Sequence, residues 1–525
     1  MKKKRPFTGL RKRPPAARYD VVIIGAGIGG LICAATLARE GVKVLLVEQH
    51  YMVGGYCSTF RRAGYTFDAA THFYPLLGNP TTMTGKVLTR LGIDTGWIKM
   101  DPVDCFHFPD GSKFVVPSDY DAYRAQLDRD FPHERENLEG FFNAVRETYL
   151  LGLLHYFKGR DAPRFARYRD LTVRDMLDRH LRDDKLKLLL TADCPHWGSP
   201  PSRTSFVFDS MLRLSYFLGN YYPEGGSQTF ADALGACIEE HGGDILMSTR
   251  CTRIRTENGR AVGVDLETHR GALKGTYRVD AETVVSNADL RLTLDELLAP
   301  EDVDPDYRAA VAAMRPSFPC FLCHIGLKDV DAETLDAIQG YYWNEWDPDT
   351  VGRNGLRCKV FAPTCYEPAM APPGGHIIIL QKVLELDYDA IDDWPRHKQQ
   401  IEDYCVDHLA SVLPGLAEKT VVRTSASAHT SWRFTLNTAG AMLGWEMSPD
   451  QLGFDRPGLV GPIDGLYIVG HWAQPGGGIT PVIVSAARVA QAISGGSGVL
   501  DSGLARWKAF DPRPDEMRLL ETVGA

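Results

Sequence analysis

Residues 19–48 read YDVVIIGAGIGGLICAATLAREGVKVLLVE, and this stretch decides the fold class. Tyr19–Ile24 is a short β-branched run, typical of a buried parallel strand. A glycine-rich turn follows, and then Leu31–Glu40, an alanine- and leucine-rich run that predicts a helix. Val42–Val47 predicts a second strand with Glu48 at its end. The order strand, glycine turn, helix, strand predicts an α/β fold built on a parallel sheet.

The turn matches the pattern G-x-G-x-x-G at Gly25, Gly27 and Gly30, with Gly29 as an additional glycine. In this pattern the first glycine permits a tight turn, the second lets the backbone approach a diphosphate, and the third lets helix and strand pack closely. The N-terminus of the helix adds free N–H groups for the phosphates. Glu48 is placed to accept hydrogen bonds from a ribose diol. The motif predicts a dinucleotide site and leaves FAD and NAD both open.

Length and composition restrict the remaining possibilities. The 525 residues suit two to four domain-sized units, and 44% hydrophobic content rules out a chain disordered throughout. The net charge is −9, but residues 1–18 hold eight Lys or Arg and no acid, so the rest carries −17. A negative body argues against a nucleic-acid-binding surface. The eleven cysteines are scattered and odd in number, which predicts a reducing, cytoplasmic compartment.

The basic leader, residues 1–18, allows two interpretations: it is a flexible solvated tail, or it attaches the protein electrostatically to anionic lipid. A secretory signal is rejected, because the apolar run after it is a strand followed by the glycine motif. Gly465–Ala487 lacks charged residues for 23 positions, which is long enough to span a bilayer. It contains Pro475, Pro481 and three consecutive glycines, so it predicts a strand, turn and helix instead of a transmembrane helix.

The run EQHYMVGGYCSTFRRAGYTFDAATHFY, residues 48–74, resembles the FAD-binding start of the phytoene desaturase, carotenoid isomerase and retinol saturase family. That family belongs to the amine-oxidase-like flavoproteins. The resemblance implies that the cofactor is FAD. It also implies that the Gly54-Gly55 loop passes close to the flavin and its ribityl chain, with Ser58 and Arg61 beside it.

The resemblance continues over residues 225–290. The pattern there predicts a helix at Phe230–His241, a strand at Ile245–Arg255, a two-residue hairpin at Asn258-Gly259, and further strands at Ala261–Leu266 and Val284–Ala288. The resemblance implies that the segment around Cys251 lays its backbone against the adenine.

The C-terminal match predicts a strand at Leu466–Val469, a turn, and a helix at Thr480–Ile493. The resemblance implies that this helix points its N-terminus at the pyrimidine edge of the flavin, where a helix N-terminus stabilises the negative charge of reduction. The residues expected at the cofactor are Gly470, His471, Gly478, Ile479 and Thr480. Many flavoproteins have Gly-Asp where this chain has Gly470-His471, so the ribityl contact differs.

The resemblance implies a Rossmann-like FAD-binding domain interleaved with an α+β substrate domain. The expected FAD-binding domain comprises residues 19–100, 225–300 and 455–495. The expected substrate domain comprises 101–224 and 301–454, and 496–525 form a C-terminal tail. The substrate domain is rich in aromatic residues, which fits an ordinary helix core, an apolar tunnel or a membrane-docking face, and spacing does not distinguish these.

Catalytic side chains are hard to read from this sequence, because a flavin itself carries the electron transfer. No Ser/His/Asp catalytic arrangement can be recognised in the sequence. The Cys320-x-x-Cys323 pair lies in a run that reads as a buried strand, so no metal site is predicted. His72 and Tyr74 follow a turn that lies near the flavin in the family, and Arg433 precedes the last flavin segment. Each is a candidate for proton transfer or substrate contact, with a packing role as its alternative.

The sequence therefore predicts an FAD-dependent oxidoreductase acting on carbon–carbon bonds of an apolar polyene or isoprenoid. Desaturation, saturation and cis–trans isomerisation all occur in the family. Pro475–Gly478 favours the desaturase branch, from which Thr71–Tyr74 departs. An FAD-dependent amine oxidase and a non-enzymatic prenyl-binding escort protein are the alternatives, and the intact glycine motif argues against the escort. Peripheral contact with membrane lipid and the oligomeric state stay open.

Overall fold

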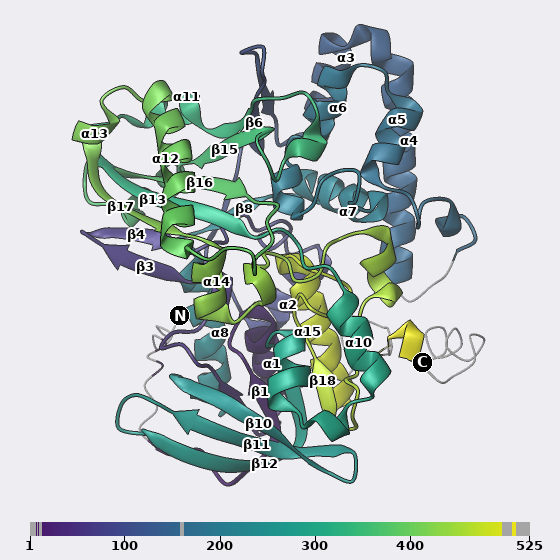
Figure 1. The fold of residues 1–525 in the computed structure, drawn as a ribbon, viewed down its shortest axis with the longest axis vertical. Coiled ribbons are helices and arrows are strands. Elements are labelled where there is room, and N and C mark those ends of the chain that lie inside the picture. The colour runs from purple at the N-terminus through teal and green to yellow at the C-terminus, as the bar shows by residue number, and fades with distance from the viewer. Residues whose placement is uncertain are drawn as a thin grey trace.

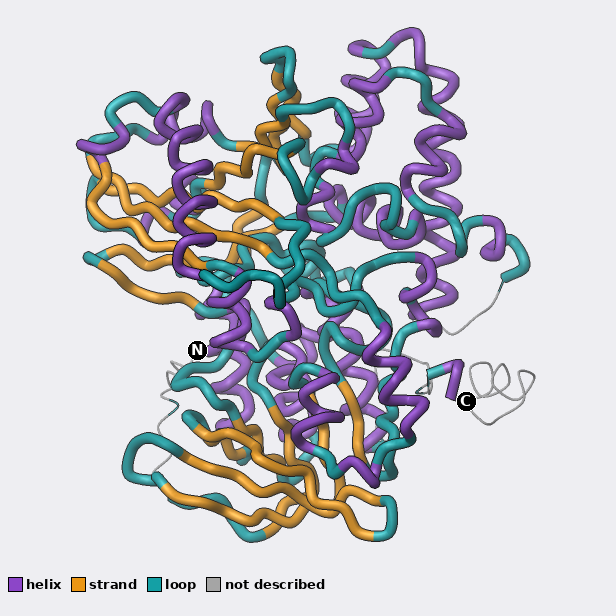
Figure 2. The backbone as a smooth tube through the Cα atoms, viewed as in Figure 1, coloured by secondary structure: helices purple, strands orange, loops and turns teal. Residues whose placement is uncertain are grey.

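Two seven-stranded sheets organise the computed structural model, one in the lower and one in the upper part of Figure 1. The structure describes residues 7, 9, 13–157, 162–495, 504 and 507–510. Most of the predicted leader and of the predicted C-terminal tail therefore lies outside the described residues. Helices fill the upper right and the middle of the molecule, and strands lie mainly at the bottom and upper left (Figure 2).

The first sheet has a parallel core in the order β18-β12-β1-β2-β9, and an antiparallel hairpin, β10-β11, pairs with the first half of β12. Val22 pairs with Leu45 of β2 on one side and with Val284 of β12 on the other. Strands buried on both faces read as continuous apolar runs, as this core does. Its strands are β1 (Arg18–Ile24), β2 (Val44–Val47), β9 (Asp244–Leu246), β10 (Thr249–Glu257), β11 (Arg260–Thr268), β12 (Gly275–Ser286) and β18 (Leu466–Ile468).

Helix α1 (Ile28–Arg39) packs between α8 (Ser227–Glu240) and α15 (Ile479–Ser494). Its first turn lies directly against the glycine turn, because a Cβ on Gly30 would stand 2.0 Å from the Gly25 carbonyl oxygen. This is the close packing that the third motif glycine predicts. Helices α2 (Met83–Leu91), α9 (Leu290–Leu292) and α10 (Pro305–Ala313) complete this half.

The second sheet runs in the order β17-β13-β16-β15-β14-β6-β7 and is antiparallel except between β14 and β6. Its strands are β6 (Asp104–His107), β7 (Lys113–Val116), β13 (Cys320–Lys328), β14 (Gly340–Trp343), β15 (Leu356–Phe361), β16 (Gly375–Val383) and β17 (Thr420–Ala426). Helix α12 (Trp394–Val412) packs on one face, with α11 (Ala332–Ile338), α13 (Leu416–Lys419) and α14 (Ala428–Thr435) around it. Two short pairs are separate: β3 (Thr59–Arg62) with β4 (Tyr65–Asp68), and β5 (Trp97–Lys99) with β8 (Tyr221–Pro223).

A group of helices stands beside the second sheet, at the upper right of Figure 1. It consists of α3 (Tyr120–Asp130), α4 (Arg135–Gly152), α5 (Val173–His180), α6 (Asp184–Thr191) and α7 (Phe206–Phe217). Their apolar faces share one core with the neighbouring face of the sheet. No helix in the described part of the chain is long and apolar enough to cross a membrane.

Three sequence expectations about elements have clear outcomes. The hairpin at Asn258-Gly259 is confirmed, and both residues have positive φ, as this turn requires. The single strand expected at Ile245–Arg255 is wrong: Ser248, at φ +53°, separates β9, which pairs with β2, from β10, which pairs with β11. Cys320 and Cys323 lie on one buried strand, as expected, and join different cores on its two faces, so the pair does not converge.

Candidate functional site

A cavity of about 700 Å³ is lined by residues of both sheets and of the helices between them. That volume falls in the range of roughly 300–1,000 Å³ typical of small-molecule and cofactor sites. Segments far apart in the sequence meet here, from the glycine turn near the N-terminus to the start of α15. The cavity has a polar part along the first sheet and an apolar part along α4 and α7.

The polar part begins at the glycine turn, where Gly25, Gly27 and Gly29 line the cavity. Helix α1 starts here with Gly27 as its N-cap, without a side-chain cap and without an acidic residue in its first turn. The free N–H groups and the helix dipole therefore favour an anion at this point.

Asn287, at the end of β12, is a site residue that sequence reasoning missed. It lines the cavity, and its side-chain N–H donates to the Gly25 carbonyl oxygen at 3.3 Å. A Cβ on Gly29 would stand 2.3 Å from Asn287 Oδ1, and one on Gly470 would stand 2.7 Å from it. These two glycines leave room for the Asn287 side chain. The N-terminal glycine turn and the loop before α15 therefore both lie against this one residue.

Glu48 lies at the end of β2 and also lines the cavity. Its carboxylate accepts hydrogen bonds from the backbone N–H of Ala26 at 2.7 Å and of His50 at 2.8 Å. Burial raises the pKa of Glu48, and these backbone donors oppose that rise. Cys251 of β10 lines the same end of the cavity. The carboxylate is held beside the glycine turn, at the place where a ribose diol can reach it.

The other end of the chain supplies the second helix N-terminus. Gly478, at φ +97°, is the N-cap of α15 and has no side-chain cap, and Ile479 and Thr480 follow it along the cavity. The Thr480 hydroxyl donates to the Pro75 carbonyl oxygen at 3.1 Å, which anchors this turn to the N-terminal region. Gly470 also lines the cavity.

His471 lies near the same turn, and burial lowers its pKa to about 3, with the positive charge of Arg456 as the second cause. Arg456 is fully buried and donates to the Trp445 carbonyl oxygen at 2.6 Å. Among the described residues no carboxylate forms an ion pair with it. A Cβ on Gly476 would stand 2.6 Å from its Nη1, so this cation lies directly behind the loop before α15.

These features fit FAD. Two uncapped helix N-termini and one fixed carboxylate line the same cavity, which suits a diphosphate, an electron-accepting ring and a ribose diol. The glycine turn leaves open space where the backbone must approach the diphosphate, since a Cβ on Gly27 would meet only Asn287 Nδ2 within 4 Å.

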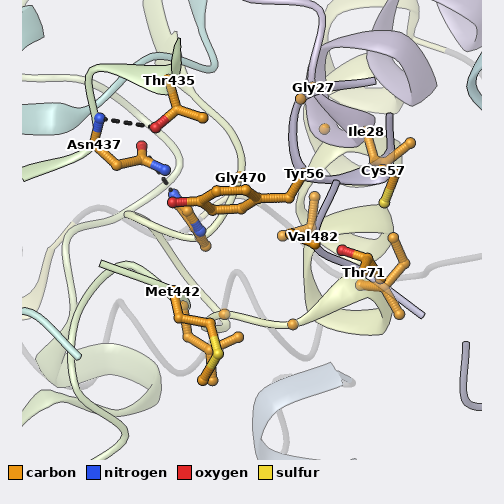
Figure 3. Close-up of a pocket in the computed structure, with 18 of the residues that line it drawn as sticks. Gly27, Ile28, Tyr56, Cys57, Thr71, Thr435, Asn437, Met442, Gly470 and Val482 are labelled. Atoms are coloured by element: carbon orange, nitrogen blue, oxygen red, sulfur yellow. Dashed lines mark hydrogen bonds between the residues drawn. The ribbon is translucent and has the colours of Figure 1, made fainter. Parts of the chain in front are cut away.

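Gly54 and Gly55 line the cavity together with Ser58. Figure 3 shows Tyr56, the residue between them and Cys57, with its hydroxyl directed toward Asn437. The hydroxyl donates to the Ala441 carbonyl oxygen at 2.9 Å. Tyr56 and Asn437 are further site residues that were missed, although Tyr56 directly follows the glycine pair.

Three predicted residues do not reach the cavity. Arg61 is the one residue of β3 that does not line the cavity, although Thr59, Phe60 and Arg62 do. Tyr74 is fully buried and packs against Trp97 and Phe230. Arg433 is exposed on α14. The structure therefore gives these three no contact with the cavity, and their roles stay predictions from the sequence. Gly30 does not line the cavity either and serves packing alone.

His72 does line the cavity. Its Nδ1 donates a hydrogen bond to the Ala70 carbonyl oxygen at 2.8 Å, and its ring stacks on Phe361 with centroids 4.6 Å apart. Its Nε2 is buried and has no hydrogen-bond partner. Burial, followed by the charge of Lys359, lowers the pKa of His72 to about 3, so the ring is a neutral acceptor.

The loop before α15 is called the flavin-side loop below. The apolar part of the cavity continues from this loop toward α4 and α7. It is lined by Phe73, Tyr149, Leu153, Tyr156, Phe208, Met211, Leu212, Tyr216, Met442 and Met447. Helix α7 turns one apolar stripe into this space and buries Phe206 and Val207 against its neighbours. A long hydrocarbon fits this lining better than a charged amine does.

The buried histidines predict an acid-sensitive fold. Burial lowers the pKa of His72 to about 3 and of His324 to about 4, and the two side chains are only 4% and 2% exposed. Between pH 6.5 and 4 the unfolded chain binds protons that the folded chain excludes. The free energy of unfolding therefore falls as pH falls, by about 1.4 kcal/mol per pH unit for each histidine. Urea unfolding at several pH values measures this slope.

The control for that slope is an exposed histidine. His324→Gln should remove about half of the pair's slope, whereas His269→Gln, at an exposed position, should leave it unchanged. Equal slopes in the native protein and His324→Gln would contradict the assignment.

Comparison with known proteins gives the family. The sequence model described as "Flavin containing amine oxidoreductase" matches residues 28–494. Prolycopene isomerase 1 of an Oncidium hybrid cultivar is 26% identical over 94% of this chain and 87% of its own. The neurosporene-forming phytoene desaturase of Rhodobacter capsulatus is 27% identical over 90% and 93%. All-trans-retinol 13,14-reductase of Rattus norvegicus is 29% identical over 68% and 61%.

Solved structures show the same fold. An oxidoreductase from Methanosarcina mazei has a TM-score of 0.64 at 20% identity, covering 89% of this chain and 99% of its own. Putrescine oxidase bound to putrescine has a TM-score of 0.63 at 16% identity, covering 92% and 100%. The family match covers residues 28–494, from the first residue of α1 to the last residue of α15, and the chain belongs to the flavin containing amine oxidoreductase family.

Proposed function

We propose that this flavoprotein is an FAD-dependent oxidoreductase that acts on carbon–carbon bonds of a long apolar polyene or isoprenoid. The observation that carries the proposal is the apolar part of the cavity, which is continuous with the turn before α15. The relatives named for prolycopene, phytoene and retinol support the same substrate class. Within it, desaturation, saturation and isomerisation remain outcomes of the experiment below.

In this proposal the N-terminus of α1 holds the diphosphate, Glu48 the ribose diol, and the N-terminus of α15 the flavin pyrimidine edge. When bound, FAD accepts or supplies a hydride. Cys251 lies at the adenine end, and the Gly54–Ser58 segment follows the ribityl chain. The buried Arg456 adds positive potential behind the flavin-side loop, which favours a negatively charged ring there.

We further propose that the first sheet and its helices form the FAD-binding domain, over residues 19–100, 225–300 and 455–495. The second sheet and the helices beside it form the substrate domain, over 101–224 and 301–454. None of the eleven cysteines forms a disulfide, which supports a reducing, cytoplasmic location.

Leu150 is 60% and Leu154 is 39% exposed beside the cavity-lining Tyr149 and Leu153, which supports peripheral lipid contact near the entrance.

Anaerobic mixing of the holoprotein with a panel of polyenes tests the function. Flavin bleaching with a dehydrogenated product indicates desaturation, oxidation of pre-reduced flavin with a hydrogenated product indicates saturation, and a changed cis/trans ratio alone indicates isomerisation. Bleaching by amines with peroxide on admission of air would instead favour an amine oxidase. A protein purified without flavin that binds prenyl chains would favour the escort alternative.

A further inference from the structure

Four polar side chains form a continuous hydrogen-bonded row beside the apolar part of the cavity. The Lys359 ammonium donates to Asp104 Oδ2 at 3.0 Å and to the Tyr341 hydroxyl at 3.1 Å. The Tyr341 hydroxyl lies 2.7 Å from His196 Nε2. Tyr341 on β14 and Lys359 on β15 are paired residues of the second sheet, and Asp104 lies on the adjoining strand β6. His196, in the turn after α6, lines the cavity.

The row leads from Asp104 to the cavity. The Asp104 side chain is 10% exposed, the Lys359 side chain 2%, and Tyr341 is fully buried. The Lys359 ammonium lies 3.8 Å from the centroid of the Phe73 ring, and Phe73 lines the cavity. Placing an ammonium group among aromatic rings costs free energy that an apolar side chain would avoid. Packing alone therefore does not account for the lysine.

The donors in the row determine where the proton of His196 lies. An ammonium group only donates, so the Tyr341 oxygen accepts from Lys359 and directs its own proton to His196 Nε2. His196 then carries its proton on Nδ1 when it is neutral. Burial lowers the pKa of His196 well below its ordinary value, with Lys359 and His72 as further causes, so the neutral form prevails.

The charges around Lys359 suit proton transfer. Burial lowers the pKa of Lys359, while Asp104, Asp193 and Cys105 oppose that change. Asp193 is the N-cap of the turn that carries His196, its charge acts on Lys359, and burial raises its pKa to about 7. A lysine whose pKa is depressed gives up a proton more readily than a solvated one.

We propose that His196 exchanges a proton with the polyene in the cavity, and that Tyr341, Lys359 and Asp104 relay this proton between His196 and solvent. The proposal rests on the proposed function, and it names the acid–base group that function requires. His196 is the catalytic residue, and the other three are positioning residues that act through it.

Saturation adds one proton and one hydride across a double bond of the substrate. The substrate double bond loses its π pair, one carbon gains the proton from His196 Nδ1, and the other gains a hydride supplied at the reduced flavin. As Nδ1 releases its proton, Nε2 takes the Tyr341 hydroxyl proton, and the Tyr341 oxygen takes one from the Lys359 ammonium. Lys359 is reprotonated from solvent by way of Asp104. Desaturation is the reverse of every transfer.

The test compares Tyr341→Phe with Tyr342→Phe in the holoprotein. Tyr342 is the next residue of β14 and donates to the Ile338 carbonyl oxygen at 2.8 Å, outside the row. With the polyene that reacts in the panel, single-turnover flavin oxidation or reduction should slow about 10- to 100-fold in Tyr341→Phe and stay unchanged in Tyr342→Phe. Polyene affinity and the flavin spectrum should be unchanged in both. His196→Asn, a second variant, should slow the step at least as much.

Histidine-selective ¹⁵N NMR supplies a readout that does not depend on turnover. The native protein and Tyr342→Phe should show the His196 proton on Nδ1, and Tyr341→Phe should lose this preference. Equal single-turnover rates in the two variants, or a native His196 protonated on Nε2, would overturn the relay. A native protein that reacts with no polyene would instead refute the proposed function, and with it the role of His196 toward a polyene.

Discussion

Gly27→Val should give a folded protein that purifies without its flavin. Gly27 caps α1 and lines the cavity, and a Cβ there would meet only the flexible end of Asn287 within 4 Å. The fold therefore tolerates the side chain, but its branched methyl groups occupy the space through which the diphosphate reaches the helix N–H groups. Losing two charge-assisted hydrogen bonds costs about 3 kcal/mol or more, which weakens FAD binding at least about 100-fold.

Gly140→Val is the matched control. A Cβ on Gly140, in α4, would stand 3.1 Å from His180 Nδ1, as close as the Gly27 Cβ stands to Asn287 Nδ2. It does not line the cavity. The visible flavin absorption of the purified protein and titration of the apoprotein with FAD measure the effect. Full flavin content in Gly27→Val, or equal loss in both variants, would show that the diphosphate does not bind at this turn.

The cofactor end of the cavity was predictable because its chemistry is local. A glycine turn, the helix it begins and the acid after the next strand lie within 30 residues, and each has a backbone reason for its residue type. The same holds for Gly478, where α15 starts after a residue with positive φ. Such features can be recognised from the local sequence, because they do not depend on contacts with distant segments.

The rest of the site depends on contacts between distant segments. Tyr74 and His72 are two residues apart, yet one packs into the core and the other reaches the cavity. The side chain of Asn287 fits where it does because Gly29 and Gly470, each more than 180 residues away along the chain, have no side chain. Tyr341 and His196 meet across 145 positions. The spacing of residues along the chain does not predict these contacts, because they follow from sheet topology and helix packing.

Asp68 lies where three parts of the chain join, and its removal should destabilise the fold more than other single changes around the site. It is fully buried at the end of β4. Its carboxylate accepts hydrogen bonds from the Ser227 backbone N–H, in the first turn of α8, at 2.8 Å and from the Tyr222 hydroxyl. Its own carbonyl oxygen accepts a hydrogen bond from His324 Nε2 of the second sheet at 2.9 Å.

Asp68→Ala leaves the Tyr222 hydroxyl and the Ser227 N–H buried without this acceptor, and each such group costs about 1–3 kcal/mol. We expect the free energy of unfolding to fall by about 4 kcal/mol in urea unfolding followed by circular dichroism. Asp68→Asn retains an acceptor for Ser227 and should lose less than half as much. Asp170→Ala, at a side chain 72% exposed, should stay within about 0.5 kcal/mol of the native value. If Asp68→Ala were as mild as Asp170→Ala, this junction would not hold the cavity wall together. The turn that presents His72 would then owe its position to packing alone.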